Sequence, residues 1–261
     1  MTVPRLTGVR IENSSGPALV LGPSLGTSST VLWARAVALL APHFSILSVD
    51  IPGHGESPAA TESFTVGELA DAVVATAADA GFEHFFYAGV SLGGQIALEL
   101  ALRHPERVDA VSIICSSAKV GQADAWHERA ATVRAQGSAV MVAGSASRWF
   151  APGFIEEQPE HAGALLNSLA HADDNSYALC CEALAASDIR DRLPQLAVPT
   201  LALWGELDGV IPPVEARAVA EGVQQGTGIE IAGAAHLAPI ERPEAVADAL
   251  LGFFRKGTTD A

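Results

Sequence analysis

The sequence predicts an α/β fold, with a mostly parallel central sheet flanked by helices and a helical cap inserted after about the sixth strand. Strand-like apolar runs alternate with helix-like stretches, which is typical of a parallel sheet covered on both faces. The pattern then becomes purely helical before strands return. We therefore expect a core of residues 1–118 and 197–261 and a cap of residues 119–196. The length of 261 residues is ordinary for one large α/β domain.

Four apolar runs of strand length precede the cap, at residues 18–22, 44–50, 84–90 and 108–115. Helical patterns separate them. Trp33, Val37 and Leu40 share one helical face after the first run. Thr65 and Glu68 form a T-x-x-E capping box, which predicts the start of the next helix.

Two further strand-like runs follow the cap, at residues 198–204 and 228–231, and a last helix begins near Pro243. In α/β sheets, the loops beyond the carboxyl ends of the strands carry the functional site. We therefore expect a cap inserted after such a strand to lie over that site.

Composition limits the class of partner. The chain has 15 Lys and Arg residues against 30 Asp and Glu residues, a formal net charge of −15. This charge repels nucleic acid and anionic membranes, so we expect neither as a partner. An anionic substrate would need a locally placed cation. The start of the chain does not resemble a signal peptide, and no apolar run reaches the roughly 18 residues of a membrane span. We expect a cytoplasmic protein.

The three cysteines, Cys115, Cys180 and Cys181, are odd in number and fit no metal-binding spacing. We expect them to be reduced, mostly buried and not catalytic.

Residues 89–93 read Gly-Val-Ser-Leu-Gly, a match to the G-x-S-x-G motif of a serine nucleophile. A predicted strand precedes the motif and a predicted helix follows it, as the motif requires. Ser91 would lie in a strained strand-to-helix turn where side chains at positions 89 and 93 would collide. The alternative interpretation is a serine in an ordinary glycine-rich turn.

A serine hydroxyl needs a neighbouring base, and an acid must orient that base. On such sheets the chain order is serine, acid, histidine. Of the eight histidines, only His236 lies between the last strand and the last helix. Glu206 and Asp208 follow the strand at 198–204. We favour Asp208, 28 positions before the histidine (236 − 208 = 28), and keep Glu206 as its rival. His54, in the turn PGHGES, is a candidate for shaping the site.

Acyl transfer also needs backbone N–H donors for the oxyanion. One donor should be Leu92, directly after the nucleophile. The other should come from the loop GPSLGTSS after an early strand, and we nominate Leu25, with Gly26 allowing close approach. The same loop also reads as a turn followed by a helix N-cap at Thr27 or Ser28.

Together these residues resemble the α/β-hydrolase superfamily over almost the whole chain. More narrowly, the sequence resembles the 3-oxoadipate enol-lactonases, also called β-ketoadipate enol-lactone hydrolases. The resemblance is carried by the segments PSLGTS, GVSLGG, SSAKVGQADAWHER, RWFAPGF and YALCCEALAASDIR. The cap segments are the more specific, because superfamily members otherwise diverge there.

The resemblance implies hydrolysis of a small enol-lactone with an acetate arm to 3-oxoadipate, a step in bacterial breakdown of aromatic compounds. It implies no metal and no organic cofactor. For the substrate carboxylate, Trp126 and Arg129 lie one helical turn apart in the cap. Arg129 could pair with the carboxylate while Trp126 packs on the ring. Arg134 and Arg148 are the other candidate cations. The alternative is a surface arginine paired with an acid, beside a tryptophan of the cap interior.

Other chemistries use the same scaffold. Another small-molecule carboxylesterase, a C–C bond hydrolase and a cofactor-free perhydrolase stay open, as does a binding protein that keeps the fold without turnover. The sequence also leaves the oligomeric state open, a homo-oligomer included.

Overall fold

A computed structural model describes residues 3–11 and 16–257 of the chain. Its centre is a seven-stranded sheet with the strand order β1-β3-β2-β4-β5-β6-β7. All neighbouring strands are parallel except β1, which pairs antiparallel with β3. The strands are β1 (Thr7–Arg10), β2 (Ala18–Gly22), β3 (Ser45–Asp50), β4 (Phe85–Val90), β5 (Val108–Ile114), β6 (Thr200–Gly205) and β7 (Gly226–Ile231).

The sheet confirms the six strands that the sequence predicts, within one or two residues at most ends. β4 and β6 are buried throughout, as expected for parallel strands covered on both faces. The sequence did not indicate β1. It is a four-residue edge strand with mostly half-buried side chains, so its apolar pattern is weak.

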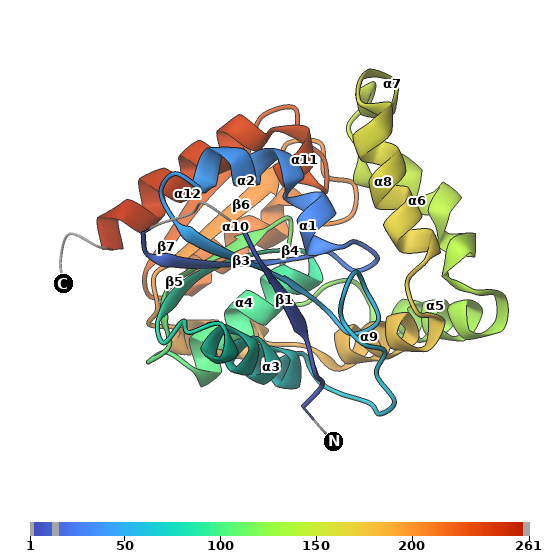
Figure 1. Ribbon diagram of the computed structural model, residues 1–261, viewed down its shortest axis with the longest axis horizontal. Helices are drawn as coiled ribbons and strands as arrows, with labels where there is room; N and C mark the ends of the chain where they lie inside the picture. Colours follow the sequence, from blue (N-terminus) through green and yellow to red (C-terminus); the bar gives the residue numbers. More distant parts are fainter. Residues whose placement is uncertain (1–2, 12–15, 258–261) are drawn as a thin grey trace.

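Helices cover both faces of the sheet (Figure 1). α1 (Ser29–Leu32), α2 (Ala34–Leu40), α11 (Ala238–Glu241) and α12 (Pro243–Gly257) gather on one face, and α3 (Val66–Asp79) and α4 (Leu92–Arg103) pack together on the other. α10 (Pro213–Gly222) packs on β6 and β7. The capping box of α3 forms as predicted, with Thr65 accepting from the Glu68 N–H and Glu68 reaching back to the Thr65 N–H. Among the residues described, no helix combines the length and apolar character needed to cross a bilayer.

The segment 119–196, which we call the cap, contains five α-helices and two 3₁₀ turns. They are α5 (Ala123–Gln136), the turn Ser138–Met141, α6 (Val142–Trp149), α7 (Phe154–Glu157), α8 (Pro159–Ala170), α9 (Asp174–Ala186) and the turn Arg190–Gln195. The cap follows β5, the fifth strand in chain order among the described residues, one strand earlier than the sequence suggests.

The cap lies beside the loops that follow the carboxyl ends of β2 and β3 (Figure 1). The Asp173 N–H donates to the Gly53 carbonyl after β3. A Cβ at Gly26, after β2, would lie 2.7 Å from the Leu169 side chain in α8. The cap thus adjoins the edge of the sheet where α/β folds carry their sites.

Candidate active site

Ser91 lies in the sharp turn between β4 and α4, with φ 56° and ψ −111°. A positive φ is strained for any residue with a side chain. A Cβ at Gly89 would lie 2.3 Å from the Gly93 carbonyl oxygen, and a Cβ at Gly93 would lie 2.6 Å from the Pro23 carbonyl oxygen. The two glycines of the motif are therefore required by backbone contacts.

Two hydrogen bonds hold the backbone of this strained residue, one at its N–H and one at its carbonyl. The Ser91 N–H donates to the Ile114 carbonyl at 2.9 Å. The Ser116 hydroxyl donates to the Ser91 carbonyl at 2.7 Å. Strain of this kind persists where neighbours over-determine it, and it gathers at functional sites. The sequence did not single out Ser116, because its contact with Ser91 exists only once β4 and β5 pair.

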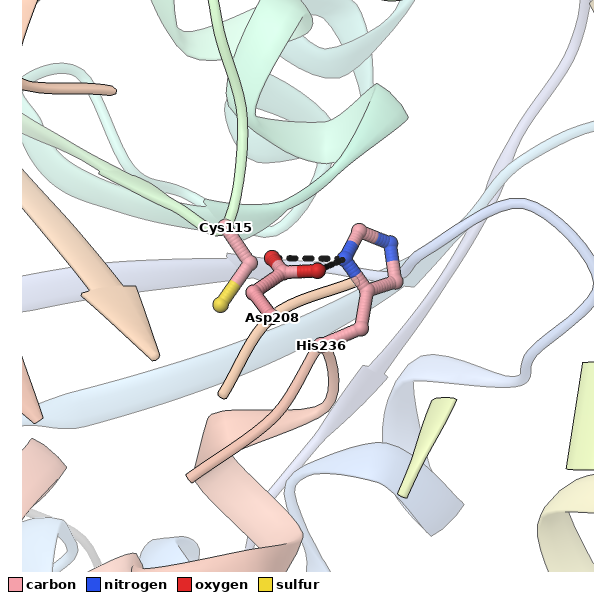
Figure 2. A group of neighbouring side chains, drawn as sticks. All are labelled: Cys115, Asp208 and His236. Carbon is pink, nitrogen blue, oxygen red and sulfur yellow. Dashed lines mark hydrogen bonds and ion pairs between the residues drawn. The ribbon is translucent and has the colours of Figure 1, made fainter. Parts of the chain in front are cut away.

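Asp208 and His236 form a buried, hydrogen-bonded pair (Figure 2). The Nδ1 atom of His236 lies 3.0 Å from Oδ2 of Asp208 and 3.2 Å from Oδ1. The backbone N–H groups of Val210 and Ile211 also donate to Oδ1. The pair has the arrangement in which an acid orients a general base, with the second ring nitrogen turned away from the carboxylate.

Electrostatics keep this carboxylate ionised. Burial raises the pKa of Asp208, but the charge and hydrogen bond of His236, together with the Ile211 and Val210 N–H groups, lower it further than burial raises it. The net pKa lies below the ordinary aspartate value of 3.8. An ionised carboxylate accepts only, so Nδ1 of His236 carries the proton and Nε2 is the basic nitrogen.

Glu206, the rival acid, faces another partner. Its Oε2 accepts from the Gly233 N–H at 2.9 Å, and its side chain is exposed. The structure therefore brings the histidine to Asp208 and not to Glu206.

Ser91 and the Asp208–His236 pair follow neighbouring strands at one edge of the sheet. β4, β5 and β6 are neighbours, and Ser91, Cys115 and the loop to Asp208 follow them in that order. Ile114 binds the Ser91 N–H, while the next residue, Cys115, lies against Asp208 and His236 (Figure 2). Within the described residues there is no hydrogen bond from Ser91 Oγ to His236. Such bonds are often long without substrate, so this link of the triad stays a prediction.

Two open backbone donors lie near the nucleophile. The Gly93 N–H donates to the Pro23 carbonyl at 3.1 Å, which brings the loop after β2 against the start of α4. Among the described residues, the N–H groups of Leu25 and Leu92 have no hydrogen-bond acceptor. Gly26 has φ +86°, and its Cβ position is crowded by Leu169 and Trp149. This geometry is compatible with the predicted oxyanion hole. Ser28, the alternative capping residue, is the N-cap of α1 but makes no side-chain capping bond.

Cys115, Asp208 and His236 could each offer one ligand atom to a metal, and these atoms lie within 4.8 Å of one another. Burial raises the pKa of the Cys115 thiol well above its ordinary value, which disfavours the thiolate that a metal needs. The carboxylate and the imidazole already bind each other. The set fits a catalytic pair beside a neutral thiol better than a metal centre.

The candidate arginines of the cap differ in whether an acid pairs with them. The Arg129 guanidinium lies 5.0 Å from the centre of the Trp126 ring. Burial raises the pKa of Tyr177 to about 12, and the nearby charge of Arg129 partly opposes this rise. Arg134 forms an ion pair with Glu182. Among the described residues, neither Arg129 nor Arg148 has a carboxylate partner. Burial lowers the pKa of Arg148, and the positive charge of Arg129 lowers it further. Arg134 is therefore neutralised, whereas Arg129 and Arg148 are available to an anion.

His54 packs against Tyr177, which lies near Arg129. Its ring stacks on Tyr177 with centres 6.0 Å apart, and its Nδ1 binds the Pro52 carbonyl. Burial lowers the pKa of His54 to about 4, so it is neutral at pH 7. The buried Nε2 has no hydrogen-bond partner. His54 thus packs against Tyr177, a residue that the sequence did not single out, and its role in shaping the site stays a prediction.

Comparisons with known proteins agree with this geometry. A family model for the alpha/beta hydrolase fold matches residues 17–243. The 3-oxoadipate enol-lactonase 2 of Acinetobacter baylyi is 34% identical over 229 residues, which cover 88% of this chain and 85% of that protein. A pimeloyl-[acyl-carrier protein] methyl ester esterase of Pectobacterium carotovorum is 29% identical, with 93% and 96% covered.

Solved structures give the same result. The enol-lactonase from Burkholderia xenovorans matches with a TM-score of 0.91 and 29% identity, covering 96% of each chain. A thermophilic esterase from Thermogutta terrifontis, solved with malate bound, matches with a TM-score of 0.90 and 25% identity, covering 97% of this chain and 94% of that chain. Ester and lactone hydrolases therefore share this architecture over nearly its whole length.

Proposed function

The chain belongs to the alpha/beta hydrolase family and is an enzyme that hydrolyses ester or lactone bonds, and on this premise we propose that it opens a small enol-lactone that carries a carboxylate. The proposed reaction converts 3-oxoadipate enol-lactone to 3-oxoadipate. The enol-lactonases among its relatives support the substrate class, and the unpaired arginines of the cap support its charge.

The proposed reaction begins at Ser91. Nε2 of His236 takes the hydroxyl proton as Oγ attacks the lactone carbonyl carbon. The carbonyl oxygen becomes an oxyanion, which the N–H groups of Leu25 and Leu92 stabilise by about 3–4 kcal/mol each. The ring C–O bond then breaks, and the released enolate takes up at carbon the proton that His236 accepted from Ser91, which gives the ketone and leaves the imidazole neutral.

The second half of the proposed reaction frees the enzyme. His236 takes a proton from water, and the resulting hydroxide attacks the acyl-serine carbonyl carbon. The Ser91 oxygen leaves with the proton from His236, and 3-oxoadipate is released. Asp208 holds the imidazole in one tautomer and stabilises its cationic form in both halves.

Arg129 is the residue proposed to bind the substrate carboxylate. Its guanidinium lies over the Trp126 ring, and its charge lies near the Tyr177 hydroxyl. Among the described residues it has no acid partner, in a chain of net charge −15. This unpaired cation is the observation that supports an anionic substrate. Acidic residues outnumber basic ones two to one in this chain, so an arginine without an acid partner is left free for a substrate carboxylate.

The test is a direct assay. Purified protein is mixed with 3-oxoadipate enol-lactone, and the loss of the enol-lactone's ultraviolet absorbance is followed. We expect rapid loss with the native protein and none above background with Ser91→Ala. Hydrolysis of p-nitrophenyl acetate is measured in parallel. A much higher kcat/KM for this neutral ester than for the lactone would overturn the lactone proposal and favour a general carboxylesterase.

A further inference from the structure

Glu241 is a buried carboxyl group that the proposed reaction does not use. It ends α11, five positions after His236, and is only 2% exposed. Its Oε2 accepts from the Ala235 N–H at 2.8 Å. Its Oε1 accepts from the Ala151 N–H at 2.5 Å, across 90 positions of sequence. One carboxylate therefore joins the residue before the catalytic histidine to the cap.

The same cap segment makes a second connection to the histidine. The Trp149 carbonyl accepts from the N–H groups of both His236 and Leu237, at 3.2 and 3.3 Å. Residues 149–151 are thus hydrogen-bonded to residues 235–237 through the Trp149 carbonyl directly and through the Glu241 carboxylate indirectly. A Cβ at Gly26 would lie 3.3 Å from the Trp149 ring, so the same cap residue also packs against the loop after β2.

Burial of the Glu241 carboxylate carries a desolvation cost. Burial raises the pKa of Glu241, and the Ala151 and Ala235 N–H groups and the charges of Arg242 and His236 lower it in part. The Cys115 thiol also lies close enough to sense its charge. An apolar residue would fill the same space without a desolvation penalty, but it could not accept from two separate N–H groups.

We propose that Glu241 is a positioning residue that latches the cap segment 149–151 to the loop of His236, so that the imidazole is correctly placed only when the cap is docked. The proposal rests on the proposed role of His236 as the base. Displacement of a catalytic group by about 1 Å lowers activity roughly 100-fold, so loss of the latch should reduce kcat more than it changes KM.

The test is a double-mutant cycle. In Glu241→Gln, the amide oxygen can still accept from one of the two N–H groups, those of Ala151 and Ala235, but the NH₂ group cannot accept from the other. Ala151→Pro removes only the N–H on the cap side. Phe150, with φ −113° and ψ 143°, already has the conformation that precedes proline, and Ala151 itself precedes Pro152. Glu244→Gln, at an exposed acid three positions further on, is the matched control.

The primary readout is the rate at which a fluorophosphonate labels Ser91, with kcat and KM on p-nitrophenyl acetate beside it. We expect Glu241→Gln and Ala151→Pro each to slow labelling about 10- to 100-fold, and the double variant to be no slower than the slower single variant. Labelling of Glu241→Gln at the rate of Glu244→Gln, or additive losses in the double variant, would overturn the latch. If Glu241→Gln does not fold, as judged by circular dichroism, Ala151→Pro alone decides.

Amide hydrogen exchange separates this proposal from the proposed function. Loss of the latch should speed exchange in both 149–151 and 235–237 of Glu241→Gln, but not in the control. Native protein that a fluorophosphonate does not label would contradict the catalytic assignment, and the exchange data would still decide whether the two segments are joined through Glu241. Unchanged exchange in both segments would refute the latch.

Discussion

The Nδ1 atom of His236 lies 3.0 Å from Oδ2 of Asp208, with the two side chains only 2% and 0% exposed. The two residues come from loops after different strands, and backbone N–H groups of residues 210 and 211 fix the carboxylate from its other side. The acid is therefore rigid and ionised before any substrate binds. Two predictions follow from this geometry.

Replacement of Asp208 by Asn should lower kcat about 10⁴-fold, because an amide no longer holds the imidazole in the tautomer that leaves Nε2 basic. Glu206→Gln is the matched control, since Glu206 follows the same strand but binds the Gly233 N–H. It should change kcat less than about threefold. Steady-state assays of both variants, together with circular dichroism, check this. Equal losses in the two variants would contradict the assignment of the acid.

The same carboxylate should make stability depend on pH. Its pKa in the folded protein lies below 3.8, so its ionised form stabilises the fold fully above 3.8 and loses that effect as the pH falls through the folded value. Asp208→Asn lacks this contribution at every pH. The difference in unfolding free energy between native protein and variant, measured by urea denaturation, should therefore shrink as the pH is lowered past 3.8. A difference in unfolding free energy that increases as the pH falls would contradict a lowered pKa of Asp208 in the folded protein.

Gly26→Ala should damage the loop that carries the Leu25 N–H. With φ +86°, and with Leu169 Cδ1 2.7 Å from the new Cβ, the variant should lose about 1–3 kcal/mol of unfolding free energy. A displaced donor should also lower kcat roughly 10- to 100-fold. Gly163→Ala, in α8 with open space around it, should instead gain up to about 1 kcal/mol without changing kcat. Kinetics and urea midpoints measure both, and a Gly26→Ala variant with native kcat would argue against this loop as part of the oxyanion hole.

Arg129→Ala should weaken turnover of an anionic lactone far more than that of a neutral ester. A charge-assisted hydrogen bond contributes about 1.5–3 kcal/mol, so kcat/KM for the anion should fall roughly 10- to 100-fold. Arg134→Ala is the control on the same helix, because Glu182 already neutralises Arg134. The ratio of the two kcat/KM values is compared across the variants. If Arg129→Ala leaves that ratio at its native value, Arg129 does not bind the carboxylate.

Local signals in the sequence were sufficient for much of the fold. Six of the seven strands stand out because buried parallel strands are continuous apolar runs, whereas the short edge strand β1 has no such run. The Thr65 capping box acts between residues three positions apart, so its geometry follows from the sequence alone. In the G-x-S-x-G motif, Gly89 is required by the nearby Gly93 carbonyl, whereas Gly93 is required by the distant Pro23 carbonyl. The helical pattern also predicts a cap that interrupts the strands, but the structure places this cap after β5, one strand earlier than the sequence suggests.

The contacts within the candidate site could not be predicted from local signals. Position after a strand was enough to nominate Asp208 and His236, but only the folded sheet shows that the histidine bonds this acid and leaves Glu206 aside. The sequence suggested Arg129 on helical spacing, yet the structure alone shows that its guanidinium lies over Trp126 and that Glu182 neutralises Arg134 instead.

By itself, the sequence determined the class of fold and the residues able to carry the chemistry, since apolar periodicity and short motifs are patterns of neighbouring positions. The tertiary structure decided which of these groups meet, and it added Ser116 and Glu241, whose partners lie 25 and 90 positions away. The physical reason is that a hydrogen bond depends on distances of a few tenths of an ångström, and the packing of sheet, loops and cap sets those distances.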